Sequence, residues 1–205
     1  MIIGITGGIG SGKSVIARQL RKMGYSVYDT DSEAKRIIVE DATVREQMTA
    51  LFGKEVYKDG VYQTSFVAQQ VFADKNLLEK LNAIVHPAVK ADIISKFRSL
   101  GVTSEPSAPS EPLNSDSDLF FIECAILFQA GFDVLCDKVV AVTAPEDIRL
   151  ERVIARDHSD MNKVRARMRA QEAEKDLQHA DIVINNDGTT PIPTLCEEII
   201  HLLTK

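Results

Sequence analysis

The feature that most constrains the fold is a glycine-rich turn set between an apolar run and a segment with helical spacing. Residues 1–6 form a mostly β-branched run that stops at Gly7-Gly8, which is typical of a buried strand entering a tight turn. From Ser14 to Met23 apolar residues recur every three or four positions, and Gly24 follows where a helix commonly ends. A second short strand is predicted at 25–28. A strand, a turn, a helix and a strand in this order predict a βαβ unit, and hence an α/β fold with a parallel sheet.

The remainder of the chain carries further elements of both kinds. Residues 32–100 are predicted to be mostly helical, with a loop at 53–60 and a helix start or kink at Pro87. Further strands are predicted at 119–122, 138–142 and 182–184, and further helices at 146–156, 162–178 and 193–203. Residues 104–118 consist almost entirely of Ser, Pro, Glu, Asp and Asn, which predicts a flexible surface loop; a phosphorylated regulatory segment is the alternative.

The overall charge argues against a nucleic-acid ligand. Lys and Arg number 24 against 30 Asp and Glu, for a net charge of −6, whereas proteins that bind duplex phosphates normally carry a basic excess. No apolar run approaches the ~18 residues of a membrane span, and no basic segment precedes the first apolar run, so we expect neither membrane insertion nor a signal peptide. The three cysteines, Cys124, Cys136 and Cys196, lack metal-binding spacing. We interpret them as small buried residues of a cytoplasmic protein.

Residues Gly7–Ser14, here named the phosphate loop, match the pattern G-x-x-x-x-G-K-[ST]. Small residues at these positions let successive backbone N–H groups turn toward a phosphate chain, and the positive end of the following helix points at the same anion. Lys13 supplies a point charge for the outer phosphates, and the Ser14 hydroxyl is a suitable ligand for Mg²⁺. The sequence therefore predicts a nucleoside triphosphate site that works with Mg²⁺; a glycine-rich turn with a solvated lysine is the alternative.

The phosphate loop alone does not distinguish a kinase from a GTPase switch or a motor ATPase. GTPases usually read guanine through Asn-Lys-x-Asp, but here Asn162-Lys163 is followed by Val164-Arg165, and no Asp-x-x-Gly occurs. A chain of 205 residues is also short for a motor ATPase. These observations favour a compact phosphotransferase for a small acceptor. A switch that binds ATP without transferring phosphate stays open as the alternative.

Two acids at predicted strand ends are candidates for chemistry. Asp31 follows the second strand, at the carboxyl edge of the sheet where open α/β folds bind ligands. Its carboxylate can take the proton of an acceptor hydroxyl, bind a Mg²⁺ water, or cap a helix beginning near Ser32. Asp29 is interpreted as structural. Glu123 ends an apolar strand and is either a Mg²⁺-linked acid or an exposed strand-end acid.

The arginines are concentrated in one predicted pair of helices. Six of the eleven lie between 149 and 169, and Arg149, Arg152 and Arg156 share one helix face. A two-helix flap that carries them can close over the phosphates and stabilise charge on the transferring group. A solvated face is the alternative, since residues 146–178 hold eight basic and eight acidic side chains. His86 is interpreted as a hydrogen-bonded structural residue rather than a metal ligand.

Several motifs occur in an order that one enzyme family shares over almost the whole chain. They are Ile5–Ser14, Asp29-Thr30-Asp31 with Ala34, His86-Pro87-Ala88-Val89, Leu127-Phe128, Arg152, Arg156-Asp157, Arg167 with Gln171, and Ala180–Gly188. With them the sequence resembles the dephospho-coenzyme A kinases. The resemblance implies an α/β P-loop kinase core, with a parallel sheet flanked by helices, a helical acceptor-binding region and a lid. It also implies transfer of phosphate from ATP, with Mg²⁺, to the ribose 3′-hydroxyl of dephospho-coenzyme A in coenzyme A biosynthesis. Another P-loop nucleoside or nucleotide kinase is the alternative.

The resemblance further implies roles for individual residues. The residues implied to bind ATP are Gly8, Gly10, Ser11, Gly12, Lys13, Ser14, Val15 and, near adenine, Asn186. Asp31 is implied as the base beside the acceptor hydroxyl. Catalytic contacts to the phosphates are implied for Lys13 and for Arg152 or Arg156 of the lid. Thr6, His86 and Leu127 are implied to lie at or near the acceptor.

The expected organisation is a single domain with ATP and dephospho-coenzyme A as its ligands, present as a monomer or weak homo-oligomer. The core is expected at about 1–36, 118–145 and 179–205, the acceptor-binding region at about 37–103 and the lid at about 146–178. Three positions depart from the family pattern. Val15 stands where Thr is frequent, and Ala125 and Gln129 stand where Pro and Glu are usual, so no role is carried over to Ala125 or Gln129.

Overall fold

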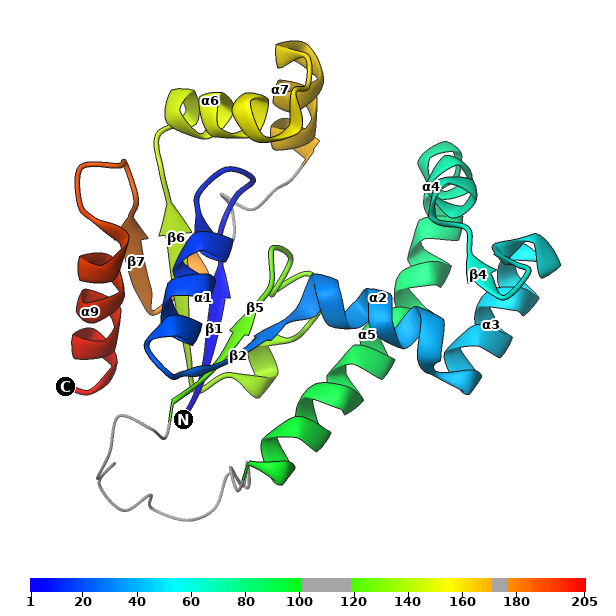
Figure 1. The fold of residues 1–205 in the computed structure, drawn as a ribbon, viewed down its shortest axis with the longest axis horizontal. Helices are drawn as coiled ribbons and strands as arrows, with labels where there is room; N and C mark the ends of the chain where they lie inside the picture. Colours follow the sequence, from blue (N-terminus) through cyan, green and yellow to red (C-terminus); the bar gives the residue numbers. More distant parts are fainter. Residues whose placement is uncertain (101–118, 171–176) are drawn as a thin grey trace. The chain divides into compact units, whose positions relative to one another are not determined.

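The computed structural model describes residues 1–100, 119–170 and 177–205 (Figure 1). The chain forms two compact units: the sheet unit, of residues 1–28 and 102–205, and the helical unit, of residues 29–101. The helical unit begins at Asp29, which directly precedes helix α2 (Thr30–Glu40). The loop predicted at 104–118 lies outside the described residues.

A five-stranded sheet forms the centre of the sheet unit. Its strand order is β2-β5-β1-β6-β7, and the pairs β1–β5, β1–β6 and β6–β7 are parallel. The strands are β1 (Ile2–Thr6), β2 (Ser26–Asp29), β5 (Phe120–Glu123), β6 (Lys138–Thr143) and β7 (Ile182–Asn185). Every residue of β1 and β5 is buried, which explains why their sequences are nearly continuous apolar runs. The predicted α/β class with a parallel sheet is confirmed.

Helices α1 (Lys13–Lys22) and α9 (Ile192–Leu203) pack on this sheet (Figure 1). Ile16 of α1 and Ile199 of α9 share one hydrophobic core with Ile3 and Ile5 of β1. Cys196 is fully buried in the same core, as its interpretation as a small apolar residue requires. The other helical segments described in the sheet unit are η3 (Asp133–Leu135), α6 (Glu146–Asp157), α7 (Met161–Ala170) and η4 (Leu177–His179). The part of the predicted 162–178 helix at residues 171–176 lies outside the described ranges.

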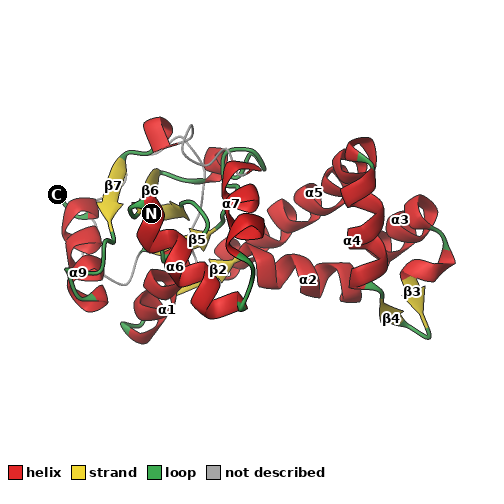
Figure 2. Cartoon of the chain, turned by 90° about the horizontal axis from the view of Figure 1, so that it is seen from above, coloured by secondary structure: helices red, strands yellow, loops and turns green. Residues whose placement is uncertain are grey.

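The helical unit consists of α-helices with one small hairpin (Figure 2). Its elements are α2, α3 (Ala42–Phe52), η1 (Lys54–Val56), β3 (Tyr57–Lys58), β4 (Val61–Tyr62), α4 (Thr64–Ala73) and α5 (Lys75–Ser99). Nowhere in the part of the chain that the structure describes is a helix long and apolar enough to cross a membrane.

Two predictions for the helical unit are wrong. A helix start at Pro87 is wrong because α5 begins after Asp74, whose carboxylate caps it, and runs through the proline; Val85 and Val89 are buried on either side. The loop predicted at 53–60 is instead η1 and the start of a hairpin. Its turn residues, Asp59 and Gly60, have φ values of 52° and 79°.

Candidate functional site

The phosphate loop forms a tight bend between β1 and α1. The N–H of Ser11 donates to the carbonyl oxygen of Gly8 over 3.1 Å, closing a turn. Gly12 then starts α1 with a left-handed φ of 94°, and a Cβ there would lie 2.1 Å from Nδ2 of Asn186, so only glycine fits. No side chain of the described residues caps the α1 N-terminus, and its first turn carries no acid. The first N–H groups of α1 therefore suit an anion.

Lys13 and Ser14 meet the acid at the end of β5. The Ser14 hydroxyl donates to Oε1 of Glu123 over 2.9 Å, and Nζ of Lys13 lies 3.9 Å from the same oxygen. The β1–β5 register places Glu123 beside Ile5, shortly before the phosphate loop. Glu123 is only 6% exposed, so the interpretation as an exposed strand-end acid is wrong. The hydroxyl and the carboxylate are hard oxygen ligands, and together they fit a Mg²⁺ ion that also binds phosphate oxygens and water.

Asn186, in the turn after β7, is tied to the phosphate loop. Its Nδ2 donates to the carbonyl oxygen of Ser11 over 2.8 Å, although the two residues are 175 positions apart. Nη1 of Arg152, on α6, donates to the carbonyl oxygen of Asn186 over 2.9 Å. Asn186 is buried, so this chain of hydrogen bonds fixes the loop after β7 and the guanidinium of Arg152 close to Gly12.

The three arginines expected on one face of α6 have different surroundings. Arg149 is buried, and its Nη1 lies 2.5 Å from the position that a Cβ of Gly8 would take. Arg156 is exposed and donates to Asp157, which also accepts from Arg167 of α7. The hydrogen bond from Arg156 lowers the pKa of Asp157 to about 2. The described contacts therefore bring Arg149 and Arg152 to the phosphate loop and hold Arg156 at the α6–α7 junction.

Three other expected site residues also lie in the sheet unit. Thr6, the last residue of β1, is buried immediately before the phosphate loop. Leu127 is fully buried, and its Cδ2 lies 2.7 Å from where a Cβ of Gly4 would be, so it packs against β1. Val15 is 45% exposed on the first turn of α1. Its side chain has no hydrogen-bonding group, and its backbone N–H donates to the carbonyl oxygen of Gly12 over 2.9 Å.

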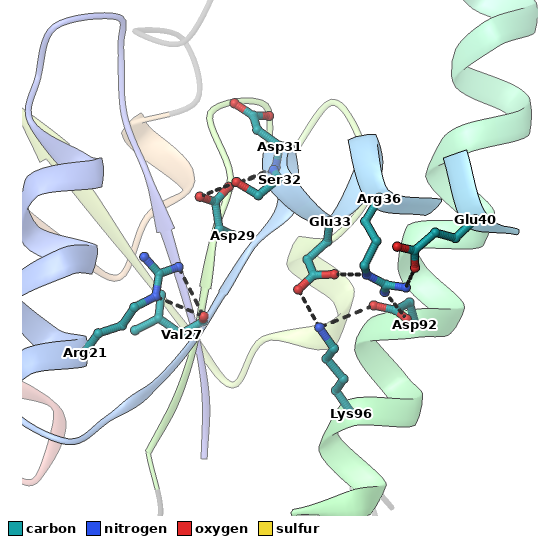
Figure 3. A network of polar contacts seen from close by, with 10 residues as sticks. All are labelled: Arg21, Val27, Asp29, Asp31, Ser32, Glu33, Arg36, Glu40, Asp92 and Lys96. Atoms are coloured by element: carbon teal, nitrogen blue, oxygen red, sulfur yellow. Dashed lines mark hydrogen bonds and ion pairs between the residues drawn. The ribbon is translucent and has the colours of Figure 1, made fainter. Parts of the chain in front are cut away.

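Asp31 and His86 belong to the helical unit. The N-cap of α2 is Asp29, whose Oδ1 accepts from the N–H groups of Asp31 and Ser32, both over 3.1 Å. The capping role considered for Asp31 is therefore wrong, and its exposed carboxylate extends away from Asp29 (Figure 3). His86 is partly buried on α5, and burial lowers the pKa of its imidazole, which keeps the ring neutral at pH 7.

Sequence reasoning underrated two residues of this site. The sequence leaves two roles open for Glu123, because a strand-end acid gives no sign of which way its side chain faces. Spacing puts Arg149, Arg152 and Arg156 on the same helix face, so it does not single out Arg149. Their contacts distinguish two of these arginines from the exposed Arg156: Arg149 lies against Gly8, and Arg152 donates to Asn186.

Comparisons with known proteins agree on one family. A family model described as dephospho-CoA kinase matches residues 1–191. The dephospho-CoA kinase of Porphyromonas gingivalis is 44% identical over 206 residues, covering 99% of this chain and 95% of that protein. The dephospho-CoA kinase of Salinibacter ruber is 39% identical over 189 residues, covering 91% of this chain and 89% of that protein.

Solved structures give the same picture for the fold. A Thermus thermophilus protein matches with a TM-score of 0.79 and 32% identity, covering 100% of this chain and 98% of that one. The dephospho-CoA kinase of Campylobacter jejuni matches with a TM-score of 0.68 and 22% identity, over 99% and 96% of the two chains. The shikimate kinase of Aquifex aeolicus, at 18% identity and a TM-score of 0.52 over 99% and 96%, shares the fold alone.

Proposed function

The chain belongs to the dephospho-CoA kinase family, and we propose how its residues divide the work of that reaction. The enzyme phosphorylates the ribose 3′-hydroxyl of dephospho-coenzyme A with ATP, giving coenzyme A and ADP in coenzyme A biosynthesis. The assignment of roles rests on one observation: Lys13 and Ser14 contact Glu123 at the start of α1, which no described side chain caps.

ATP binds through the phosphate loop in this proposal. The backbone N–H groups of the ATP-binding residues surround the triphosphate, with Lys13 on its outer phosphates. These residues are Gly8, Gly10, Ser11, Gly12, Lys13, Ser14 and Val15. Asn186 belongs to the same site because its amide fixes the carbonyl oxygen of Ser11. Support for this arrangement comes from the left-handed φ values of Gly10 and Gly12, 81° and 94°, which bend the chain as a phosphate cradle requires.

Mg²⁺ is the metal that we propose for this site. Ser14 would hold it directly, and Glu123 would hold it directly or through a bound water. When bound, the ion neutralises negative charge on the phosphates. The Ser14 oxygen can bind the ion through a lone pair while its hydrogen still donates to Glu123, and the Lys13 ammonium faces the same carboxylate.

Asp31 acts as the base in this proposal. The acceptor oxygen attacks the γ-phosphorus, the bond from phosphorus to the β–γ bridging oxygen breaks, and the proton of the acceptor hydroxyl passes to the Asp31 carboxylate. Two observations support the choice: Asp29 already caps α2, and the Asp31 carboxylate is exposed. Thr6, His86 and Leu127 are proposed to contribute to acceptor binding, His86 as a neutral hydrogen-bonding group and Leu127 as a buried apolar residue.

The helical pair α6–α7 is proposed as part of a lid of about residues 146–178, and the helical region of about 37–103 as the acceptor-binding region. Arg152 is the lid residue that we place on the phosphates, because it already bonds beside Gly12. Arg156 would need to leave Asp157 to take that role. Closing a lid excludes water, which would otherwise compete with the acceptor for the phosphoryl group.

Replacing Asp31 by asparagine tests the base. We expect Asp31→Asn to lower kcat by about 100-fold or more, since general-base catalysis contributes that much, while leaving the Kd for ATP unchanged. Asp147→Asn is a matched control, because Asp147 is also an exposed acid in the first turn of a helix. Steady-state rates for both variants decide the matter: full turnover by Asp31→Asn removes Asp31 as the base.

The setting of the enzyme completes the proposal. We place it in the cytoplasm, acting as a monomer or weak homo-oligomer without nucleic acid. The three cysteines are free thiols, as is usual in a reducing compartment.

A further inference from the structure

We infer that Arg149 is a positioning residue that holds the phosphate loop in its ATP-binding shape. The inference rests on the proposed role of the phosphate loop in binding ATP. It assigns to α6 a second function besides carrying Arg152, namely to support residues 8–10 of the loop from one side.

The first contact is between the Arg149 side chain and Gly8. A Cβ at Gly8 would lie 2.5 Å from Nη1 of Arg149 and 3.7 Å from its Cζ. The guanidinium therefore fills the space in front of the Gly8 backbone that any other residue's side chain would need. Arg149 is only 9% exposed, so its planar head is packed in the protein rather than extended into solvent. Glycine at position 8 and arginine at position 149 fit each other.

The second contact uses the main chain of the same residue. A Cβ at Gly10 would lie 2.5 Å from the carbonyl oxygen of Arg149 and 3.0 Å from its Cα. Gly10 has a φ of 81°, so the bend itself also requires glycine there. At Gly10, two residues after the contact between Gly8 and the guanidinium, the phosphate loop therefore lies so close to the α6 backbone that no side chain fits between them.

The third contact is hydrophobic and lies between the other two. Ile9 packs against the small core of Leu150, Val153 and Val164, which joins α6 to α7. Residues 8, 9 and 10 of the loop consequently rest on one helix through a guanidinium, an apolar side chain and a backbone carbonyl. Three contacts of different kinds at three successive residues restrict both the position and the direction of the phosphate loop.

The charge of Arg149 adds to this shape effect. The Arg149 guanidinium is positively charged, and burial beside the loop reduces the screening of this charge by water. A triphosphate that enters the loop meets this fixed positive charge in addition to Lys13. Arg149 does not need to touch the nucleotide for either effect, which is why we call it a positioning residue and not a catalytic one.

Substitutions at position 149 separate charge from shape. We expect Arg149→Gln to raise the Kd for ATP, measured by calorimetry with Mg²⁺ and no acceptor, by about tenfold, because it removes both a fixed charge near the triphosphate and the support of Gly8. The KM for dephospho-coenzyme A should stay within about twofold. Arg149→Lys should recover part of the affinity, because it restores the charge without the planar head. Arg18→Gln, an exposed arginine on α1, is the matched control.

A double-mutant cycle with Gly8→Ala tests the contact itself. Gly8→Ala alone should weaken ATP binding, because its methyl group must displace the guanidinium. In the Arg149→Gln background the same change should cost less, because the shorter side chain leaves room. Purely multiplicative effects of the two changes would overturn the contact as the cause.

Two further results bear on the inference. An unchanged Kd for ATP in Arg149→Gln, or equal losses for ATP and dephospho-coenzyme A, overturns it. Melting curves of each variant show whether a loss reflects unfolding; if Arg149→Gln does not fold, Arg149→Lys and Gly8→Ala give the same test. Failure of the proposed function is a separate outcome, since wild type would then bind ATP, with the predicted Arg149 dependence, without phosphorylating dephospho-coenzyme A.

Discussion

Gly12, Asn186 and Arg152 show at the residue scale how three distant parts of the chain build one surface. The amide of Asn186 fits against Gly12 only because glycine has no Cβ, and the Asn186 carbonyl then accepts from Arg152. Each of the three limits the others, so an isolated substitution here should disturb the phosphate loop and not merely remove one contact. The same reasoning separates Arg152 from Arg156, whose guanidinium is held by a neighbouring acid.

Lys13→Ala tests the phosphate loop at this scale. Loss of the ammonium beside Glu123 should raise the Kd for ATP by about 10- to 100-fold, the value of a hydrogen bond to a charged group, and lower kcat as well. Lys22→Ala, at the exposed end of the same helix, is the control. Calorimetry and initial rates measure the two quantities, and wild-type values for Lys13→Ala would refute the assignment of the loop.

The thiols give a second residue-scale prediction. Burial raises the pKa of Cys136 to about 12 and that of Cys196 to about 11. At pH 8 about one Cys196 thiol in a thousand is then the reactive thiolate. Iodoacetamide should therefore label the folded protein slowly and the unfolded protein quickly at both positions, as peptide mass spectrometry can show. Rapid labelling of folded Cys196 would mean that α9 opens readily from the sheet.

An ion-pair network joins α2 to α5 at the element scale (Figure 3). Arg36 donates to Glu33 over 2.5 Å and to Asp92 over 2.7 Å, and Lys96 donates to Glu33 over 2.5 Å. Burial raises the pKa of Glu33, but the hydrogen bonds from Lys96 and Arg36 outweigh it and hold that pKa below its ordinary value. Because Glu33 lies two residues after Asp31, the network also fixes the turn that carries the proposed base.

Arg36→Gln measures what this network contributes. Its side chains are partly exposed, so we expect the free energy of unfolding to fall by only about 1 kcal/mol at pH 7. A lowered carboxyl pKa stabilises the fold above the ordinary value of 4.5, and this contribution is lost as the pH falls through the lowered pKa. Urea titrations of both proteins should therefore differ at pH 7 and converge toward pH 3. A difference that grows on acidification would contradict this account.

The elements that the sequence predicts well are those with a strong local pattern. The βαβ start, the strands around it and the closing helix follow from apolar runs, spacing and glycine positions. The sequence does not decide between a helix start and a kink at Pro87, because it shows the local penalty of proline but not the burial of Val85 and Val89 that favours one helix through it. Asp29 and Asp31 are equally good caps by residue type, and only the start of α2 at Thr30 decides between them.

At the scale of the whole molecule, the two units carry different parts of the proposed reaction. The phosphate loop, Glu123, Asn186 and the α6 arginines all belong to the sheet unit, whereas Asp31 and His86 belong to the helical unit. Contacts within the sheet unit therefore suffice to arrange the proposed ATP site. The sequence predicts the first of these parts from one motif, but the second only through family resemblance, because no local pattern marks an acceptor site.

The most direct test of the account is ADP formation by the wild-type protein with ATP, Mg²⁺ and a series of acceptors. A coupled assay should show ADP release with dephospho-coenzyme A, matched one for one by coenzyme A. Uridine, AMP and shikimate should leave the rate at the level without acceptor. Equal release with any of these acceptors, or slow ATP hydrolysis that no acceptor changes, would contradict the account.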